Sequence, residues 1–257
     1  MLVPKLPLHT GRPLAKPQVY ISAKMKSRRL VLFSGMAADG RLFRSIRIPE
    51  VEIVTPDHAD PAPGEMLTQY ATRIADSLCI QADDIVGGIS FGGMLAGEIA
   101  RQRRVAGLIL LGSCLRPDRL PRSYRWIEQF GVFIPDFLLR FRSWRPLVRW
   151  RFAPITRDAE ICLIEMANSS TTAQIRAFGR MIMGWAGADD VSCPVLSIHG
   201  DFDRIIPLKS ASPDVILKDA GHAFTLTHGD QTTSAIREFL QTRVVPELEP
   251  MRRLAPS

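Results

Sequence analysis

A glycine-rich turn at residues 88–93 constrains this chain more than any other feature of its sequence. The segment reads GISFGG, and it lies between an apolar pair at 85–86 and a helical pattern at 94–101. A strand that turns this sharply into a helix crowds the positions two residues away from its apex, where only glycine lacks a Cβ that would clash. The pattern predicts a strained turn with the hydroxyl of Ser90 at its apex, which makes Ser90 a candidate nucleophile.

A glycine-rich turn between a strand and a helix is also typical of phosphate-binding loops. A Walker A loop requires a lysine directly after its last glycine, and no lysine follows Gly93. The turn also lacks the G-x-G-x-x-G spacing of dinucleotide-binding folds. The sequence therefore favours a nucleophile at this turn over a phosphate site.

Short apolar runs alternate with helical patterns along most of the chain. This alternation predicts an α/β fold with a doubly wound, mostly parallel sheet. A length of 257 residues is enough for one such domain. The expected strands are 30–33, 51–54, 85–86, 105–111, 195–198 and 215–217, and the expected helices are 66–80, 94–101 and 232–243.

The regular rhythm divides the chain into a core, an insertion and two terminal segments. Residues 29–113 and 189–245 are expected to form the core, and residues 114–188 a helical insertion above the carboxyl edge of the sheet. Residues 1–28 contain four prolines and show no helical or strand periodicity, so they are predicted to form a flexible arm. Residues 246–257 are expected to form a C-terminal tail. With no long apolar run and no signal-peptide pattern, the expected location is the cytoplasm.

The composition restricts the possible partners and cofactors. The formal net charge of +7 admits an anionic partner, but a solvated basic surface is the favoured interpretation, and no nucleic-acid-binding module is present. The four cysteines contain no C-x-x-C pair, so neither a metal site nor a cofactor is expected. Cys79 and Cys114 lie in apolar stretches and are predicted to be buried free thiols.

A nucleophilic serine requires a base, and the chain has five histidines. His222 follows the strand at 215–217, and Asp203 follows the strand at 195–198, so both lie where parallel strands end. Asp201 leaves the same strand but is better placed to hold its own turn. His199 is expected to pack at the strand end, and His228 is a weaker alternative base. His9 and His58 lie earlier in the chain.

The order of these elements resembles the α/β-hydrolase family. The matching segments are 34–36, 88–92, 200–203 with Pro207, and 221–222, within a region spanning residues 30–243. The resemblance implies a compact member without the first two strands of the family, and a serine hydrolase with Ser90 as nucleophile, His222 as base and Asp203 as the acid that orients it.

The resemblance also implies an oxyanion hole and a cap. Two backbone N–H groups, of Phe91 and Met36, are expected to bind the oxyanion, although Ser34-Gly35 replaces the His-Gly that is frequent in the family. The insertion is expected to cover the serine, and its aromatic residues favour an apolar acyl group, with Phe133 and Phe137 as candidate substrate-binding residues.

Several functions remain compatible with these residues. A carboxylic ester is the first expectation for the small-molecule substrate, followed by a thioester and then an amide or C–C bond. The alternative is a non-catalytic binding protein that uses the basic insertion. Contact of that insertion with a membrane surface is a less favoured hypothesis. The oligomeric state stays open.

Overall fold

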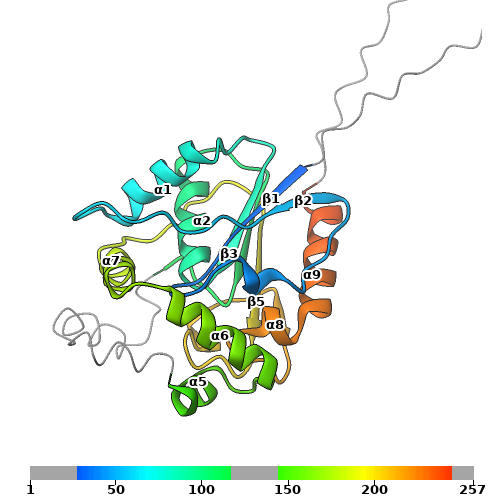
Figure 1. Cartoon of the computed structure of the whole chain (residues 1–257). Helices are drawn as coiled ribbons and strands as arrows, with labels where there is room; N and C mark the ends of the chain where they lie inside the picture. The colour runs from blue at the N-terminus through cyan, green and yellow to red at the C-terminus, as the bar shows by residue number, and fades with distance from the viewer. Residues whose placement is uncertain (1–27, 117–143, 245–257) are drawn as a thin grey trace, which may run out of the picture.

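The computed structural model describes residues 28–116 and 144–244, which contain a six-stranded sheet between two layers of helices (Figure 1). Every strand pairing is parallel, which confirms the predicted fold class. The strand order is β2-β1-β3-β4-β5-β6. The strands are β1 (Arg28–Phe33), β2 (Val51–Val54), β3 (Ile85–Ile89), β4 (Gly107–Leu111), β5 (Val195–Gly200) and β6 (Val215–Leu217).

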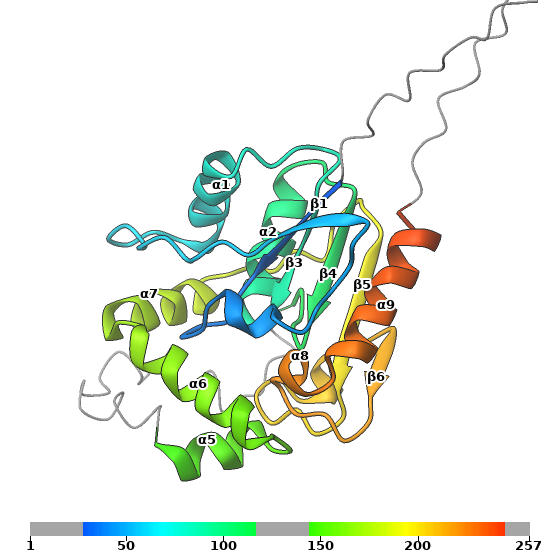
Figure 2. The same ribbon diagram turned by 45° about the vertical axis from the view of Figure 1, so that its right-hand side comes forward.

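The four central strands are buried on both faces, which explains why their sequences are largely apolar. In β1, Val31 and Phe33 point into one hydrophobic cluster, and Leu30 and Leu32 point into the other. The first cluster is completed by α1 (Leu67–Ser77) and α2 (Phe91–Gln102). The second is completed by η1 (Gly40–Phe43), α8 (Phe224–Thr227) and α9 (Gly229–Thr242), on the opposite side of the sheet (Figure 2).

The strand order reverses at β1, and this reversal positions the site. The chain runs from β1 outward to β2 and then returns to β3 on the other side of β1. The connections that leave the carboxyl ends of β1 and β3 therefore diverge and open a crevice between them. The turn at Ser90 follows β3, so it lies at this crevice.

Three helices of the insertion lie beyond the carboxyl ends of the strands (Figure 2). They are α5 (Arg145–Phe152), α6 (Arg157–Ser169) and α7 (Thr172–Met183), between β4 and β5. The hydroxyls of Thr156 and Thr171 accept hydrogen bonds from amides in the first turns of α6 and α7, which fixes where each helix begins. Within the described ranges, no helix is long and apolar enough to span a bilayer.

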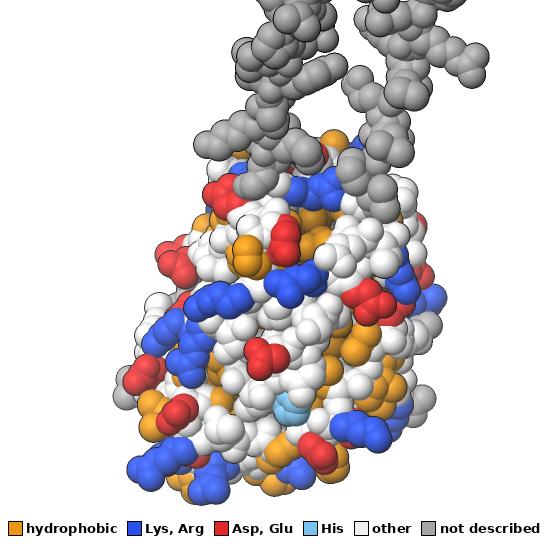
Figure 3. All heavy atoms as spheres, turned by 90° about the vertical axis from the view of Figure 1, so that its right-hand side faces the viewer, with side chains coloured by type: hydrophobic (Ala, Val, Ile, Leu, Met, Phe, Trp, Pro, Cys, Tyr) orange, Lys and Arg blue, Asp and Glu red, His pale blue; other side chains and the backbone are white. Residues whose placement is uncertain are grey.

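The surface over α9 mixes both signs of charge (Figure 3). Arg237 of α9 lies 3.5 Å from Glu50, and Arg243 lies 3.1 Å from Asp214. Basic side chains on this face are therefore interspersed with acidic ones, as expected for a solvated surface.

Two expectations about local structure were wrong in detail. Cys79 is exposed, because it follows the end of α1 with φ of 49°, where the chain reverses outside the core. Cys114 is buried, as predicted. The helix expected from Met94 begins instead at Phe91, because the chain enters α2 directly after Ser90.

Candidate active site

Ser90 occupies the apex of the turn between β3 and α2. Its φ of 55° and ψ of −121° are uncommon for a residue with a side chain, and such backbone strain costs about 1–3 kcal/mol. Two hydrogen bonds hold the turn: the Ser90 amide donates to the Leu111 carbonyl at 3.0 Å, and the Ser113 hydroxyl donates to the Ser90 carbonyl at 2.7 Å. The surrounding backbone therefore maintains the strained conformation of the half-buried Ser90.

The two glycines that flank Ser90 are required by close backbone approach. A Cβ on Gly88 would lie 2.5 Å from the Phe33 carbonyl oxygen and from the carbonyl carbon of Gly92. A Cβ on Gly92 would overlap the carbonyl oxygens of Phe33 and Ser34. The crowding thus comes from the end of β1 as well as from the turn itself.

His222 and Asp203 form a buried pair at the carboxyl ends of β5 and β6. His222 Nδ1 lies 2.6 Å from Asp203 Oδ2. Asp203 Oδ1 accepts hydrogen bonds from the amides of Ile205 and Ile206, at 2.8 and 2.9 Å. With its Nδ1–H donated to the carboxylate, His222 keeps the lone pair of Nε2 for a second partner.

The electrostatic environment keeps Asp203 ionised. Burial alone would raise the pKa of this carboxyl, but the charge of His222, its hydrogen bond and the Ile206 amide outweigh it. The pKa of Asp203 is therefore lowered from its usual value. An ionised carboxylate at this position is able to orient the His222 imidazole and to stabilise its protonated form.

The other candidate acids and bases have different partners. Asp201 Oδ1 accepts a hydrogen bond from the Ala220 amide at 3.1 Å, and His228 Nδ1 lies 2.8 Å from the Thr227 hydroxyl. His58 Nε2 lies 2.9 Å from the Ser34 carbonyl oxygen. His9 lies outside the described residues. Of the candidate pairs, the structure brings together His222 and Asp203.

Ser90 and His222 line one cavity of about 290 Å³. Met36 and Phe91, the predicted oxyanion residues, line it as well. Its walls are largely apolar, and α5, α6 and α7 supply many of them. These helices contribute Leu147, Val148, Arg151, Phe152, Leu163, Ala167, Ile175 and Ile182. Phe133 and Phe137 lie outside the described residues. Phe152 at the end of α5 lines the cavity, and its ring is centred 6.1 Å from the His222 ring.

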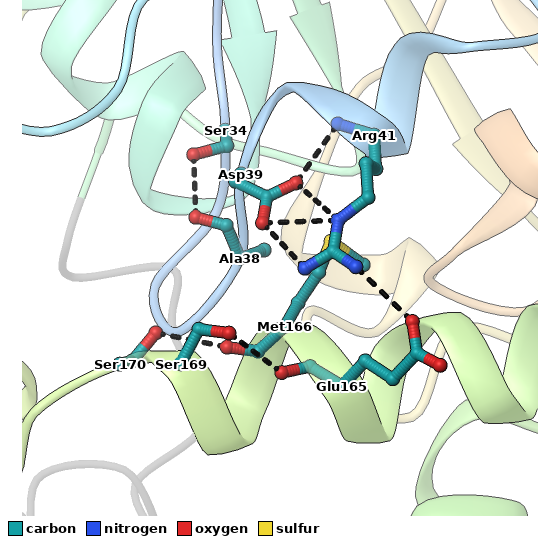
Figure 4. A network of polar contacts seen from close by, with 8 residues as sticks. All are labelled: Ser34, Ala38, Asp39, Arg41, Glu165, Met166, Ser169 and Ser170. Atoms are coloured by element: carbon teal, nitrogen blue, oxygen red, sulfur yellow. Dashed lines mark hydrogen bonds and ion pairs between the residues drawn. The ribbon is translucent and has the colours of Figure 1, made fainter.

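The loop after β1 is tied to the insertion by a polar network (Figure 4). The Ser34 hydroxyl donates to the Ala38 carbonyl at 2.9 Å. Arg41 binds Asp39 through both of its carboxylate oxygens and reaches Glu165 of α6 at 3.1 Å. The contact with Glu165 is exposed, so it contributes little stability, but it links the Met36 loop to the wall of the cavity.

Gly112 was missed by the sequence reasoning. It directly follows β4 with φ of 50°, and a Cβ there would lie 3.2 Å from Asp203 Oδ2 and 3.3 Å from His222 Nδ1. A glycine after an apolar strand is a turn signal, so the sequence contained a clue. Its proximity to the pair depends on the pairing of β4 with β5, which the sequence does not specify.

The comparisons with known proteins identify the family. A model described as "Alpha/beta hydrolase family" matches residues 28–235, most of the chain. The chain therefore belongs to the α/β hydrolase family. Among the described residues, no group of three or more histidine, cysteine, aspartate or glutamate side chains is arranged to hold a metal ion.

Similar proteins include several esterases. The pimeloyl-[acyl-carrier protein] methyl ester esterase of Aromatoleum aromaticum is 27% identical over 208 residues, which cover 70% of this chain and 82% of that protein. A thermophilic esterase from Thermogutta terrifontis has a TM-score of 0.64 and 24% identity, with 85% and 91% of the chains covered. An esterase from Exiguobacterium antarcticum has a TM-score of 0.67 and 15% identity, with 84% and 92% covered. These structural likenesses concern the fold.

Proposed function

We propose that this chain is an esterase-like serine hydrolase that cleaves carboxylic esters through an acyl-enzyme on Ser90. The observation that carries the proposal is that a serine at a strained turn borders the same apolar cavity as His222, whose ring is bound to the buried Asp203. A binding protein would have no need for this combination of groups. The esterase named among the relatives supports an ester as the first substrate class.

In the proposed mechanism, His222 Nε2 takes the proton of the Ser90 hydroxyl while Oγ attacks the ester carbonyl carbon. The amides of Met36 and Phe91 bind the oxyanion, and His222 then donates the proton to the departing alcohol. A water molecule, deprotonated by His222, attacks the acyl-enzyme and releases the carboxylic acid and Ser90. Asp203 remains ionised throughout.

The amides of Met36 and Phe91 are suited to this role because neither donates a hydrogen bond to the protein within the described ranges. Phe91 is the first residue of α2, so its N–H has no acceptor one turn earlier and lies at the positive end of the helix dipole. The oxyanion would supply the acceptor that both amides lack.

The helices of the insertion act as the cap that selects the acyl group. Leu147, Leu163 and Ile182 come from three different helices and border the cavity. Burial of acyl carbons against such side chains contributes about 25 cal/mol per Å². A cavity near 290 Å³ is at the small end of ligand sites, so a short or medium apolar acyl chain fits it best.

The test is hydrolysis of a C2-to-C12 series of p-nitrophenyl and methyl esters, with a thioester and an amide of the preferred acyl group. We expect kcat/KM to be highest for an oxygen ester, and Ser90→Ala to lose nearly all turnover while it still folds. Higher kcat/KM for the thioester or amide would reassign the substrate class. Absence of turnover on every substrate, with no labelling by a fluorophosphonate, would favour the binding-protein alternative.

A further inference from the structure

A second histidine lies against the acid of the candidate triad. His199, on β5, is fully buried, and its Nε2 lies 2.6 Å from the Ile206 carbonyl oxygen and 3.4 Å from Asp203 Oδ2. Ile206 in turn donates its amide to Asp203 Oδ1. Ile206 is thus held from both sides: its amide binds Asp203, and its carbonyl binds His199. These two contacts fix the turn at residues 203–206.

The charge state of His199 follows from these contacts. A carbonyl oxygen can only accept, so the proton of the ring is on Nε2. Burial lowers the pKa of His199, against the opposing effects of the Ile206 carbonyl and Asp203, and keeps the ring neutral. Of the described ionisable groups, Asp203 and His222 are those that act on it.

Nδ1 of His199 is a buried atom without a hydrogen-bond partner among the described residues. An unsatisfied buried polar atom typically costs about 1–3 kcal/mol, which an apolar side chain of similar size would avoid. Packing alone therefore does not account for a histidine at this position, whereas the contacts of Nε2 do.

We propose that His199 is a positioning residue for the reaction at Ser90. Its neutral ring fixes the turn that carries Asp203, so that Oδ2 points at His222, and it adds no second cation to compete with the imidazolium of His222. This inference rests on the proposed function, because it gives Asp203 the role of orienting the catalytic base.

Three variants of His199 separate this role from simple packing. His199→Gln places an N–H donor near the position of Nε2 and keeps the bond to Ile206. His199→Asn has a donor that is too short to reach the same carbonyl, and His199→Leu has none. His228→Leu is the control, because His228 contacts Thr227 and does not border the cavity.

We expect His199→Leu and His199→Asn to lower kcat per titrated active site by roughly 10-fold or more, with KM changed less, because the acid moves relative to His222. The acid limb of the kcat/KM profile should move to lower pH by about half a unit, since a looser carboxylate stabilises the imidazolium less. His199→Gln should recover most of kcat, and His228→Leu should behave as the wild type.

A packing role predicts lower thermal stability with kcat per active site and the acid limb unchanged, and that result would overturn the proposal. A folded Gln variant as impaired as Asn would overturn it as well. If Leu does not fold, the comparison of Asn with Gln decides. NMR titration of His222 in the same variants measures the same shift without turnover, so an inactive wild type would refute the proposed function while His199 is still tested.

Discussion

Replacement of Gly112 by alanine is expected to disturb the His222–Asp203 pair directly. Gly112 has φ of 50°, and a Cβ would lie 3.2 Å from Asp203 Oδ2, 3.3 Å from His222 Nδ1 and 3.4 Å from the Phe224 ring. The distances to Asp203 Oδ2 and His222 Nδ1 are shorter than most Cβ contacts in proteins, so these two side chains must move by a few tenths of an ångström. The buried pair has little space in which to do so.

Gly64→Ala is the matched control. Gly64 also has a positive φ, of 74°, but a Cβ there would have no atom within 4 Å. A left-handed conformation costs an alanine about 1–2 kcal/mol, so both variants should lose that much stability. For a chain of this size, the loss corresponds to a fall in Tm of about 2–8 °C.

Only Gly112→Ala should affect the reaction. Displacement of a catalytic group by about 1 Å costs roughly 100-fold in rate, so a shift of Asp203 or His222 by a few tenths of an ångström should lower kcat about 10-fold. The assay is p-nitrophenyl ester hydrolysis normalised to active sites titrated with a fluorophosphonate, alongside thermal melting. Equal Tm losses with full kcat in both variants would refute the view that Gly112 leaves room for the pair.

Three further expectations concern the cavity, the thiols and the acid. Leu163→Phe fills part of the cavity and should shift the preferred ester to a shorter acyl chain, with a loss of about 1 kcal/mol or more in transition-state binding for each excluded methylene. Ile161→Phe, on the exposed side of α6, is the control and should leave the chain-length profile unchanged. Equal profiles in both variants would count against the cap. In the native protein, a thiol reagent should modify Cys79 before Cys114 and Cys162, which are buried, and equally fast reaction of the buried pair would contradict the packing. The pKa of Asp203 is lowered in the folded state, so its contribution to stability is complete above its unfolded value near pH 4 and is lost as the pH falls through the folded value. The difference in unfolding free energy between the wild type and Asp203→Asn should therefore narrow below about pH 4 in urea titrations, and a constant difference would refute the role assigned to this carboxylate.

The strands and the turn could be predicted because their signals are local. Central parallel strands are short, largely apolar runs, and even the less buried edge strands β2 and β6 have the predicted bounds. The glycines around Ser90 mark a turn that few other residues can form. Asp203 and His222 each follow a predicted strand, and the carboxyl ends of parallel strands meet at one edge of the sheet, so their neighbourhood could also be predicted.

The remaining features depend on register and on tertiary packing. Leu111 pairs with Ile198, and this register places Gly112 and His199 beside the acid. No local pattern encodes that alignment. Cys79 lies in an apolar stretch, but the way α1 ends turns it to solvent. Phe152, at the end of α5, faces the cavity because of how the insertion packs on the core.

The central claim is that Ser90 is a nucleophile activated by His222. The measurement that tests it most directly is fluorophosphonate labelling followed by peptide mass mapping, in the wild type and in His222→Gln. We predict one phosphonyl group per chain, on Ser90, and labelling slowed by at least about 100-fold in His222→Gln, because general-base catalysis contributes roughly 10²–10⁴-fold. Labelling at another residue, or equal rates in the two proteins, would contradict the claim.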